Sequence, residues 1–579
     1  MRTLGLETEY AIRFREEPGF AHPGNRTIFS AFSDALRLRT GGALNGERYA
    51  LQGQIFTANG GCFAYEFLPT ASQRGLLEAG TPECSSALET VLYQRAQERL
   101  LVEAIPEVER RLGCRPGQIG LLKNCRDAQG HIYGTQENYD AELARGWRLA
   151  AYRILAAATL FLLSVFALIQ VVFGVGIVVS LLLTVSTAMF VLRAFLRLLY
   201  AWTGLPRFLT WLHGARRLWP GIESLLTSGR LEVGLYYLLD PLMLTLLFPL
   251  TQGLRALAFR PYRSGAETFF VTRIPLSGAG TLMEDGRFAL SEKGTAATGL
   301  TRRNGAASER VLFDFGNLRK ELLTASVQVL VANVDPVRRL FRRRQRLQIG
   351  LSDANRSQLA EYLKLGTALI VLEMAESGVL RDAPRLRSPL AALRRIVHDP
   401  ELSGRYALRA KGAAPCTAVE LQRWYWRRAR SYLESSGTMT PERREILRLW
   451  EEVLDGLDQD PALLQGDLDW VTKQSLLERL PPSFSFDARK MADLRYHELG
   501  DGPYSDLLAA GATPAMFSDE EVALATINPP SHPAARDRSE FIARWSGRDA
   551  AAAVSWSGGW VRWKGKRERV LFGGGMARA

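Results

Sequence analysis

A long uncharged segment in the middle of the chain constrains the fold more than any other feature of the sequence. From Ile154 to Leu192 no charged residue occurs, and this run is about twice the roughly 20 residues that a helix needs to cross a bilayer once. Gly174 and Gly176 lie near its centre and indicate a tight turn. The pattern therefore predicts a transmembrane helical hairpin over about 153–195.

Arginines flank this segment on both sides. Arg145, Arg148 and Arg153 precede it, and Arg193 and Arg197 follow it. Basic residues concentrate on the cytoplasmic side of membrane spans, so both ends of the hairpin are expected in the cytoplasm. We therefore expect a multi-pass protein of the inner (cytoplasmic) membrane whose main body faces the cytoplasm. A hairpin buried in the core of a soluble protein is the alternative interpretation.

A second apolar stretch predicts a further helix over about 235–250. Asp240, Pro241 and Pro249 interrupt this stretch. A carboxylate at the centre of a bilayer costs roughly 2.5–3.5 kcal/mol on insertion scales. An interfacial, re-entrant or core helix is therefore favoured over a third membrane span.

The first ten residues indicate a metal site. They are predicted to form a strand, and because side chains alternate along a strand, Glu7 and Glu9 share one face. Adjacent carboxylates repel each other, and a divalent cation relieves this repulsion. The pair therefore indicates Mg²⁺, which in turn suggests a nucleotide. Two acids on a solvent-facing strand are the alternative reading.

Composition excludes several classes of protein. A hydrophobic content of 47% excludes wholesale disorder. The five cysteines form no C-x-x-C pair, and the six histidines form no H-E-x-x-H motif. The net charge of +13 could indicate nucleic acid, but the basic residues concentrate near the apolar insertion and in runs such as 338–344. A juxtamembrane location explains them at least as well, so no nucleic-acid partner is expected.

Several short segments match one family in the same order along the chain. They include residues 5–10 (GLETEY), 63–66 (FAYE), 81–84 (TPEC), 133–139 (YGTQENY), 346–355 (RLQIGLSDAN), 468–471 (LDWV) and 494–498 (LRYHE). Together they resemble the Pup ligase and depupylase family, also called the proteasome accessory factor family. Its members join a small ubiquitin-like protein to lysines, or remove it. The matches cover both ends of the chain and leave out roughly residues 145–260.

The resemblance implies an α+β fold. We expect a glutamine-synthetase-like antiparallel sheet with helices, a small C-terminal domain and, in this chain, the inserted transmembrane helical hairpin. The expected parts are 1–147 and 261–500 for the catalytic domain, 148–260 for the membrane insertion and 501–579 for the C-terminal domain. Locally, residues 265–300 read as short strands, 357–377 as a helix and 550–579 as a strand pair.

The resemblance also implies the metal ligands. The family's metal positions correspond here to Glu7, Glu9, Glu78, Gln136 and Gln348. The family places histidines at the last two positions, and this chain has glutamines. A glutamine carbonyl oxygen is a hard ligand that Mg²⁺ accepts, so the replacement is chemically tolerable.

Catalytic and nucleotide-binding residues follow from the same resemblance. Glu66 falls where the family places its catalytic aspartate. A glutamate keeps the carboxylate but moves it outward by one methylene. The expected nucleotide-binding residues are Asn124, Glu137, Asn138 and Asp353.

The implied function is that of an ATP- and Mg²⁺-dependent ligase. ATP would phosphorylate the C-terminal glutamate of a small acidic ubiquitin-like modifier, and a lysine of a client protein would attack the acyl phosphate. Glu66 would act as base or charge partner, the reaction would occur at the membrane, and the proteasome pathway is the implied context. A depupylase that hydrolyses the isopeptide bond is one alternative. A catalytically degenerate membrane-anchored scaffold, suggested by Gln136 and Gln348, is another.

Overall fold

The structure is a computed structural model that describes residues 2–18, 20–46, 53–66, 75–168, 190–191, 248–301, 311–314, 318–330 and 335–573. The chain divides into two compact units. The first comprises Met1–Glu142, Arg260–Gly316 and Arg346–Ala579, and the second comprises Leu143–Phe259 and Asn317–Gln345. The domain boundaries expected from the sequence stay a prediction.

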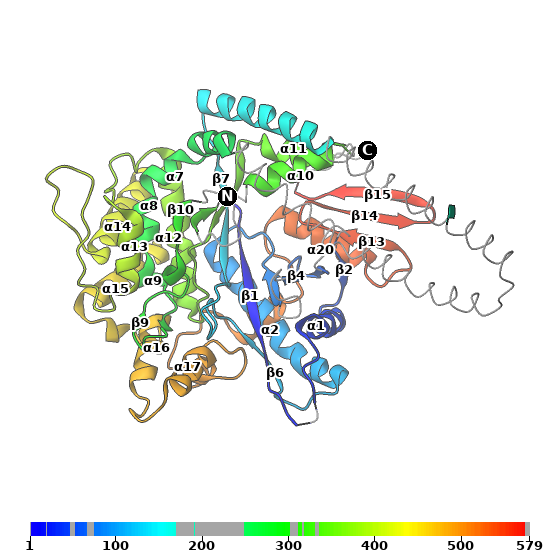
Figure 1. The fold of residues 1–579 in the computed structure, drawn as a ribbon, viewed down its shortest axis with the longest axis horizontal. Helices are drawn as coiled ribbons and strands as arrows, with labels where there is room; N and C mark the ends of the chain where they lie inside the picture. The colour runs from blue at the N-terminus through cyan, green and yellow to red at the C-terminus, as the bar shows by residue number, and fades with distance from the viewer. Residues whose placement is uncertain are drawn as a thin grey trace. The chain divides into compact units, whose positions relative to one another are not determined.

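A ten-stranded sheet forms the body of the first unit (Figure 1). Its order is β10-β11-β12-β7-β1-β5-β4-β3-β2, and β6 pairs with the end of β1. The strands are β1 (Leu4–Phe14), β2 (Ala43–Asn45), β3 (Ile55–Thr57), β4 (Cys62–Glu66), β5 (Leu76–Gly80), β6 (Ile119–Leu122), β7 (Gln136–Glu142), β10 (Gly299–Thr301), β11 (Val311–Asp314) and β12 (Arg344–Ile349). The pairs of β1 with β5, β6 and β7 are antiparallel, whereas β10 and β11 run parallel.

Strand β1 has two chemically different faces. Leu4, Leu6 and Tyr10 are buried on one face, while Glu7 and Glu9 alternate with them and are partly exposed. This alternation confirms the predicted N-terminal strand, because period-two burial is the property of a strand with one face in the core.

Two helices cover the apolar face of the sheet. They are α1 (Asn25–Arg39) and α2 (Ala87–Leu112), and their side chains form one core cluster with Tyr10, Phe63 and Leu77 of the strands. The N-terminus of α2 is capped by Ser86, whose hydroxyl accepts the Glu89 amide at 3.2 Å. With this face closed, the opposite face of the strands is left to carry the acidic side chains.

The remaining helices of the first unit surround this layer. They are α7 (Arg260–Gly265), α8 (Glu267–Thr272), α9 (Ile274–Ser277), α12 (Gln358–Ser377), α13 (Pro389–Val397), α14 (Ala418–Ser435), α15 (Pro441–Gln459), α16 (Asp469–Glu478), α17 (Phe486–Arg495), α18 (Pro503–Ala509), α19 (Asp519–Ala525) and α20 (Pro533–Trp545). The predicted helix over 357–377 is confirmed. The strands predicted from residue 265 are wrong for 267–277, which form α8 and α9, and only the short pair β8 (Thr281–Leu282) and β9 (Phe288–Ala289) follows.

A small three-stranded sheet closes the first unit. Strands β13 (Ala551–Val554), β14 (Gly558–Trp563) and β15 (Lys566–Leu571) form an antiparallel meander. This confirms strands in the C-terminal segment, but there are three instead of the predicted pair. Figure 1 shows these strands and α20 beside β2 and β4. Phe541, Trp545 and Val554 share a core cluster with Phe56 of β3, so this segment is packed onto the edge of the large sheet.

The second unit contains a helix over Trp147–Leu168, together with α10 (Leu318–Leu330) and α11 (Asp335–Leu340). By length and composition, this helix is the one among the described residues that could cross a membrane, with a mean hydropathy of 1.9. The expected second span near 175–195 lies outside the described residues except for 190–191, and the stretch 235–250 except for 248–250. The hairpin therefore stays a prediction.

Candidate functional site

Carboxylates from three neighbouring strands gather on the open face of the sheet. Glu9 of β1 lies directly opposite Glu78 of β5, and Glu78 lies opposite Ala64 of β4. Glu66 is two residues further along β4 and therefore shares that face. Together with Glu7, these side chains form what we call the acidic face.

Mutual repulsion dominates the electrostatics of the acidic face. The pKa of Glu78 lies well above its usual value because of burial, and the carboxylates of Glu7, Glu9 and Glu66 raise it further. Arg346 acts in the opposite direction. Without an added cation, the cluster therefore favours a proton on Glu78.

Strands β7 and β12 supply cationic and amide groups next to Glu7. Arg346 donates to both oxygens of Glu7, at 3.0 and 2.8 Å, and to Oδ1 of Asn138 at 2.7 Å. Gln136 lies opposite Glu7 in the β1–β7 register and accepts a hydrogen bond from the Gln348 amide. The five residues predicted as metal ligands thus lie on adjacent strands, with the two glutamines bonded to each other.

A backbone amide holds Glu9 from the side. Gly134 donates its N–H to Oε2 of Glu9 at 2.8 Å. Gly134 has a φ of 104° and a Cβ there would lie 2.2 Å from Sγ of Cys125, so only glycine fits this turn.

An aromatic ring from the C-terminal segment stands at the edge of the acidic face. A Cβ on Gly80, which lies opposite Glu7, would be 3.0 Å from the indole of Trp556. Arg538 supports this ring, because its guanidinium lies 4.6 Å from the ring centroid and donates to the Trp556 carbonyl at 2.9 Å. Trp556 remains 36% exposed and can therefore contact a ligand bound beside it.

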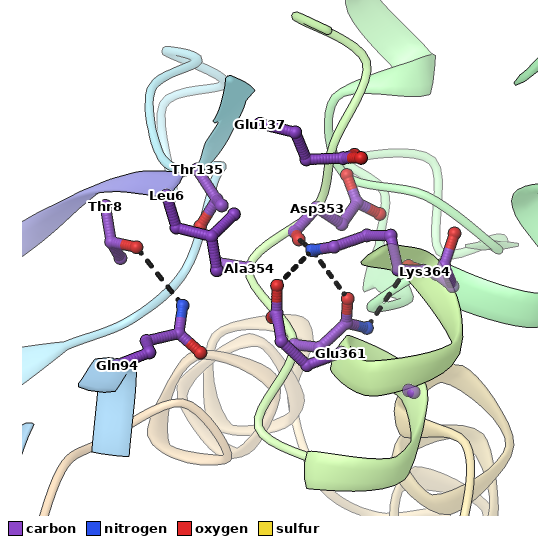
Figure 2. A network of polar contacts seen from close by, with 12 residues as sticks. Leu6, Thr8, Gln94, Thr135, Glu137, Asp353, Ala354, Glu361 and Lys364 are labelled. Carbon is purple, nitrogen blue, oxygen red and sulfur yellow. Dashed lines mark hydrogen bonds and ion pairs between the residues drawn. The ribbon is translucent and has the colours of Figure 1, made fainter. Parts of the chain in front are cut away.

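Three of the residues expected to bind nucleotide have partners inside the protein. Glu137 is buried and paired with both terminal nitrogens of Arg273, at 3.0 and 2.6 Å. Asn124 donates to the Arg126 carbonyl at 2.6 Å. The Asp353 carboxylate accepts three backbone amides, and Figure 2 labels Asp353 and Glu137 beside Lys364, which donates to the Asp353 carbonyl at 2.6 Å. Only Asn138 faces the acidic site, through Arg346, so the nucleotide-binding assignments stay a prediction.

The donor chemistry of the acidic face fits a divalent cation. Carboxylate oxygens are the ligands that Mg²⁺ and Ca²⁺ prefer. On the acidic face, the neighbouring carboxylates of Glu7, Glu9 and Glu66 raise the pKa of Glu78. Within the described ranges, no three His, Cys, Asp or Glu side chains are already arranged to hold a metal ion. The fit is therefore one of residue chemistry, and the predicted ligand set stays a prediction.

Comparison with known proteins assigns the chain to a family. The family model described as Pup-ligase protein matches residues 2–559. The chain therefore belongs to the Pup ligase family, and the resemblance seen in the sequence is confirmed.

Curated relatives cover both reactions of the family. A depupylase of Acidothermus cellulolyticus is 35% identical over 298 residues, which are 49% of this chain and 55% of the relative. Pup–protein ligases of Mycolicibacterium gilvum and Mycobacterium tuberculosis are 34% and 36% identical over 214 and 216 residues, covering 35% of this chain and 47% of each relative. The chain thus spans about half the length of the curated relatives it matches.

Solved structures support the fold. The complex between the prokaryotic ubiquitin-like protein Pup and its ligase PafA aligns with a TM-score of 0.63 at 18% identity, covering 99% of this chain and 89% of that one. PafA in complex with ADP aligns with a TM-score of 0.56 at 17% identity, covering 96% and 92%. The predicted α+β fold is confirmed.

Two groups at this site, Arg346 and Trp556, were not predicted from the sequence as site residues. Arg346 lies inside the matched segment 346–355, but its pairing with Glu7 depends on how β12 is placed relative to β1. Trp556 reaches Gly80 only because the C-terminal sheet packs on the large one. Neither contact leaves a local pattern, since both join segments hundreds of residues apart.

Proposed function

We propose that the chain is an ATP- and Mg²⁺-dependent ligase that joins the C-terminal glutamate of a small acidic ubiquitin-like modifier to lysines of client proteins at the membrane. The observation that carries this proposal is the acidic face, where four carboxylates share one partly open sheet surface. Membership of the Pup ligase family supports the reaction class, and the ADP bound to the related PafA supports the nucleotide.

Each residue of the acidic face has a role in this proposal. Glu7, Glu9 and Glu78 would hold Mg²⁺, and the bound ion would neutralise charge on the transferred phosphate. Glu66 lies beside this group on β4 and accepts a proton from the attacking lysine amine. The Gly134 amide fixes the orientation of Glu9.

ATP turnover by the detergent-purified full chain tests the enzyme. ADP formation is measured with Mg²⁺, with and without a Pup-like peptide, for the wild type, Glu66→Ala and the matched control Glu520→Ala, which removes an exposed carboxylate of α19. We expect peptide-stimulated turnover that falls by about 100-fold or more in Glu66→Ala, the usual contribution of a general base, and is kept in the control. A folded sample without turnover or nucleotide binding would contradict the enzyme proposal and leave the membrane-anchored scaffold.

Depupylation is the second candidate, and one observation favours it. The curated depupylase aligns over 298 residues, whereas the ligases align over 214 to 216. The same purified chain decides between the reactions when it receives either a lysine substrate with the peptide or a preformed conjugate. Conjugate formation supports the ligase, and release of the modifier supports the depupylase.

Membrane insertion is the remaining part of the proposal. On the helix Trp147–Leu168, the exposed side chains of Ile154, Phe161 and Leu168 repeat every seven residues and form an apolar stripe, with Phe161 67% exposed. Such a stripe fits lipid, and the uncharged run continues to residue 192. These features support the proposal that the chain is a multi-pass protein of the inner membrane with its catalytic unit in the cytoplasm.

Alkaline carbonate extraction of membranes tests this location. The wild-type chain is expected in the membrane pellet, and Phe161→Lys is expected to weaken insertion, because a lysine at the centre of a span costs roughly 2.5–3.5 kcal/mol. Leu463→Lys is the matched control, since Leu463 is 63% exposed in the first unit. Release of the wild-type chain into the supernatant would contradict membrane insertion.

A further inference from the structure

We propose that Asp353, Glu292 and Lys293 form a buried bracket that positions Glu9 through the backbone of residues 125–135. The hydrogen bonds of these three side chains run to backbone atoms outside the acidic face, so we treat them as positioning residues rather than catalytic ones. The inference rests on the proposed function, because the orientation of Glu9 matters only if the acidic face binds a cation.

Asp353 anchors the bracket. Its Oδ2 accepts the backbone amides of Ala279 and Glu292, at 2.9 and 3.0 Å, and its Oδ1 accepts the amide of Lys293 at 2.9 Å. The side chain is 3% exposed. Three backbone hydrogen bonds to one buried carboxylate fix where residues 292 and 293 lie, and they leave Asp353 engaged away from the acidic face.

Glu292 and Lys293 in turn hold the segment 125–135 at both ends. The Glu292 carboxylate accepts the amide of Cys125, and the Lys293 ammonium donates to the carbonyl of Thr135. Both side chains are buried. Ala354, next to Asp353 and labelled with Thr135 in Figure 2, adds a third contact by donating its amide to Sγ of Cys125 at 3.2 Å.

The segment held at these points turns back on itself and ends at Glu9. Tyr133 donates its amide to the Cys125 carbonyl at 3.0 Å, so the two ends of the segment are tied together. Gly134 follows directly, and its amide is the group that donates to Glu9. Thr135 follows Gly134 in the chain, and Cys125 is hydrogen-bonded to Tyr133, the residue before Gly134. A shift at Cys125 or Thr135 therefore moves the Gly134 amide.

Glu292 makes the bracket sensitive to pH. Burial raises the pKa of Glu292 to about 7, Lys473 lowers it, and Asp353 and Asp493 raise it. Lys473 lies 3.7 Å and His497 3.5 Å from its carboxylate, and burial keeps the pKa of His497 well below its usual value, so that this imidazole is neutral. Ionisation of Glu292 above about pH 7 strengthens its hydrogen bond from Cys125.

Hydrogen exchange at the Gly134 amide tests the bracket without any ligand. Exchange is followed by NMR on the cation-free full chain at pH 8, with Leu77 of β5 as the reference for global opening. We expect about tenfold faster exchange at Gly134 in Glu292→Gln and in Lys293→Met, with Leu77 unchanged. Glu284→Gln is the matched control: Glu284 also contacts this segment, through Arg126, but at an exposed site. Unchanged exchange at Gly134 in both bracket variants would overturn the proposal.

Cation binding then shows whether the bracket acts through Glu9. Mn²⁺ serves as the probe, and its affinity is measured by electron paramagnetic resonance between pH 6 and 8.5. We expect the wild-type affinity to rise more steeply through pH 7 than that of Glu292→Gln, and the difference to vanish when Glu9→Gln is added to both. A difference that persists in the Glu9→Gln background would contradict the bracket. Absence of Mn²⁺ binding in the wild type would instead contradict the proposed function, with the exchange result unaffected.

Discussion

The acidic face and the buried ion-pair network on the other side of the sheet use the same residue types with opposite results. We define the network by its charged members: Arg95, Glu98, Lys123, Glu137, Arg273, Arg356, Glu361 and Lys364. Burial alone would raise the pKa of Glu98, but Arg95, Lys123 and Arg356 outweigh it, and its pKa lies below the usual value. On the acidic face, the pKa of Glu78 is raised instead.

The difference lies in where the positive charge comes from. In the network, each carboxylate has a guanidinium or ammonium within about 4 Å, as Glu98 has with Lys123 at 2.9 Å. On the acidic face, Glu78 faces three other carboxylates, and Arg346 pairs with Glu7. The sheet thus carries one set of acids that is stabilised by ion pairs and another in which neighbouring carboxylates raise the pKa of Glu78, and this second set is where we propose that a cation binds.

The largest effect is expected from breaking the network. Arg273→Ala removes the two hydrogen bonds to Glu137 and those to the carbonyls of Leu351 and Lys364, both at 3.2 Å. A buried carboxylate left without its partner costs about 3–5 kcal/mol of stability. Urea denaturation measures this loss, and Arg430→Ala, which breaks an exposed pair with Glu434, should change stability little. A loss for Arg273→Ala as small as that of the control would mean that the network is not stabilised by pairing.

This contrast also separates what the sequence predicts from what it cannot. The shared face of Glu7 and Glu9 follows from strand periodicity, because it depends on neighbouring residues only. Glu78 and Glu66 required the family resemblance, since the register of β4 and β5 against β1 is a tertiary property. No pattern in the sequence indicates the ion-pair network. The family resemblance assigns Glu137 to the nucleotide site, and only the structure reveals its pairing with Arg273.

Tertiary packing also overrode local propensity at α8. Residues 268–272 (TFFVT) are β-branched or aromatic, and such residues favour strands. They form α8 because Phe269 packs against Tyr425 and Trp450, with ring centroids 5.5 and 5.9 Å apart. The Gln422 amide donates to the Phe269 carbonyl at 2.9 Å and fixes that turn. These partners lie more than a hundred residues away, beyond the reach of any local pattern.

The next effect concerns Gly134, where a backbone amide reaches the acidic face. Gly134→Ala places a methyl group against Cys125 at a φ of 104°, which only glycine adopts without strain. We expect a loss of about 1–3 kcal/mol in the free energy of unfolding, together with weaker cation binding. Gly117→Ala is the matched control, because Gly117 has a φ of 81° with nothing within 4 Å of the added methyl group. Equal losses for both variants would show strain alone and no contact with Cys125.

A smaller effect of opposite sign is expected from Glu78→Gln. The folded-state pKa of Glu78 is raised above its unfolded value, so its ionisation costs stability as pH rises above about 4.5. In EDTA at pH 8, the variant should therefore be more stable than the wild type by on the order of 1 kcal/mol, with the difference shrinking towards pH 4.5. Added Mg²⁺ should stabilise the wild type more than the variant, because the variant keeps a carbonyl oxygen but loses one negative charge. Thermal unfolding checks both statements, with Glu16→Gln, at an exposed position just after β1, as control. A variant less stable than the wild type in EDTA would contradict the repulsion.

The smallest effect is expected at Trp556, which borders the acidic face without belonging to it. Its indole packs over Gly80 of β5, which lies opposite Glu7 of β1. Its ring also contacts Phe56, with 5.1 Å between the ring centroids. Cation or nucleotide binding at the acidic face should therefore change the fluorescence of this partly exposed tryptophan. Trp556→Phe should remove that signal while changing affinity by only about twofold, because a phenyl ring keeps most of the apolar contact. Trp563→Phe, at a similarly exposed ring on β14, should leave the signal in place. Loss of the signal in Trp563→Phe instead would place the ligand away from Gly80 and break the assignment of the acidic face as the binding surface.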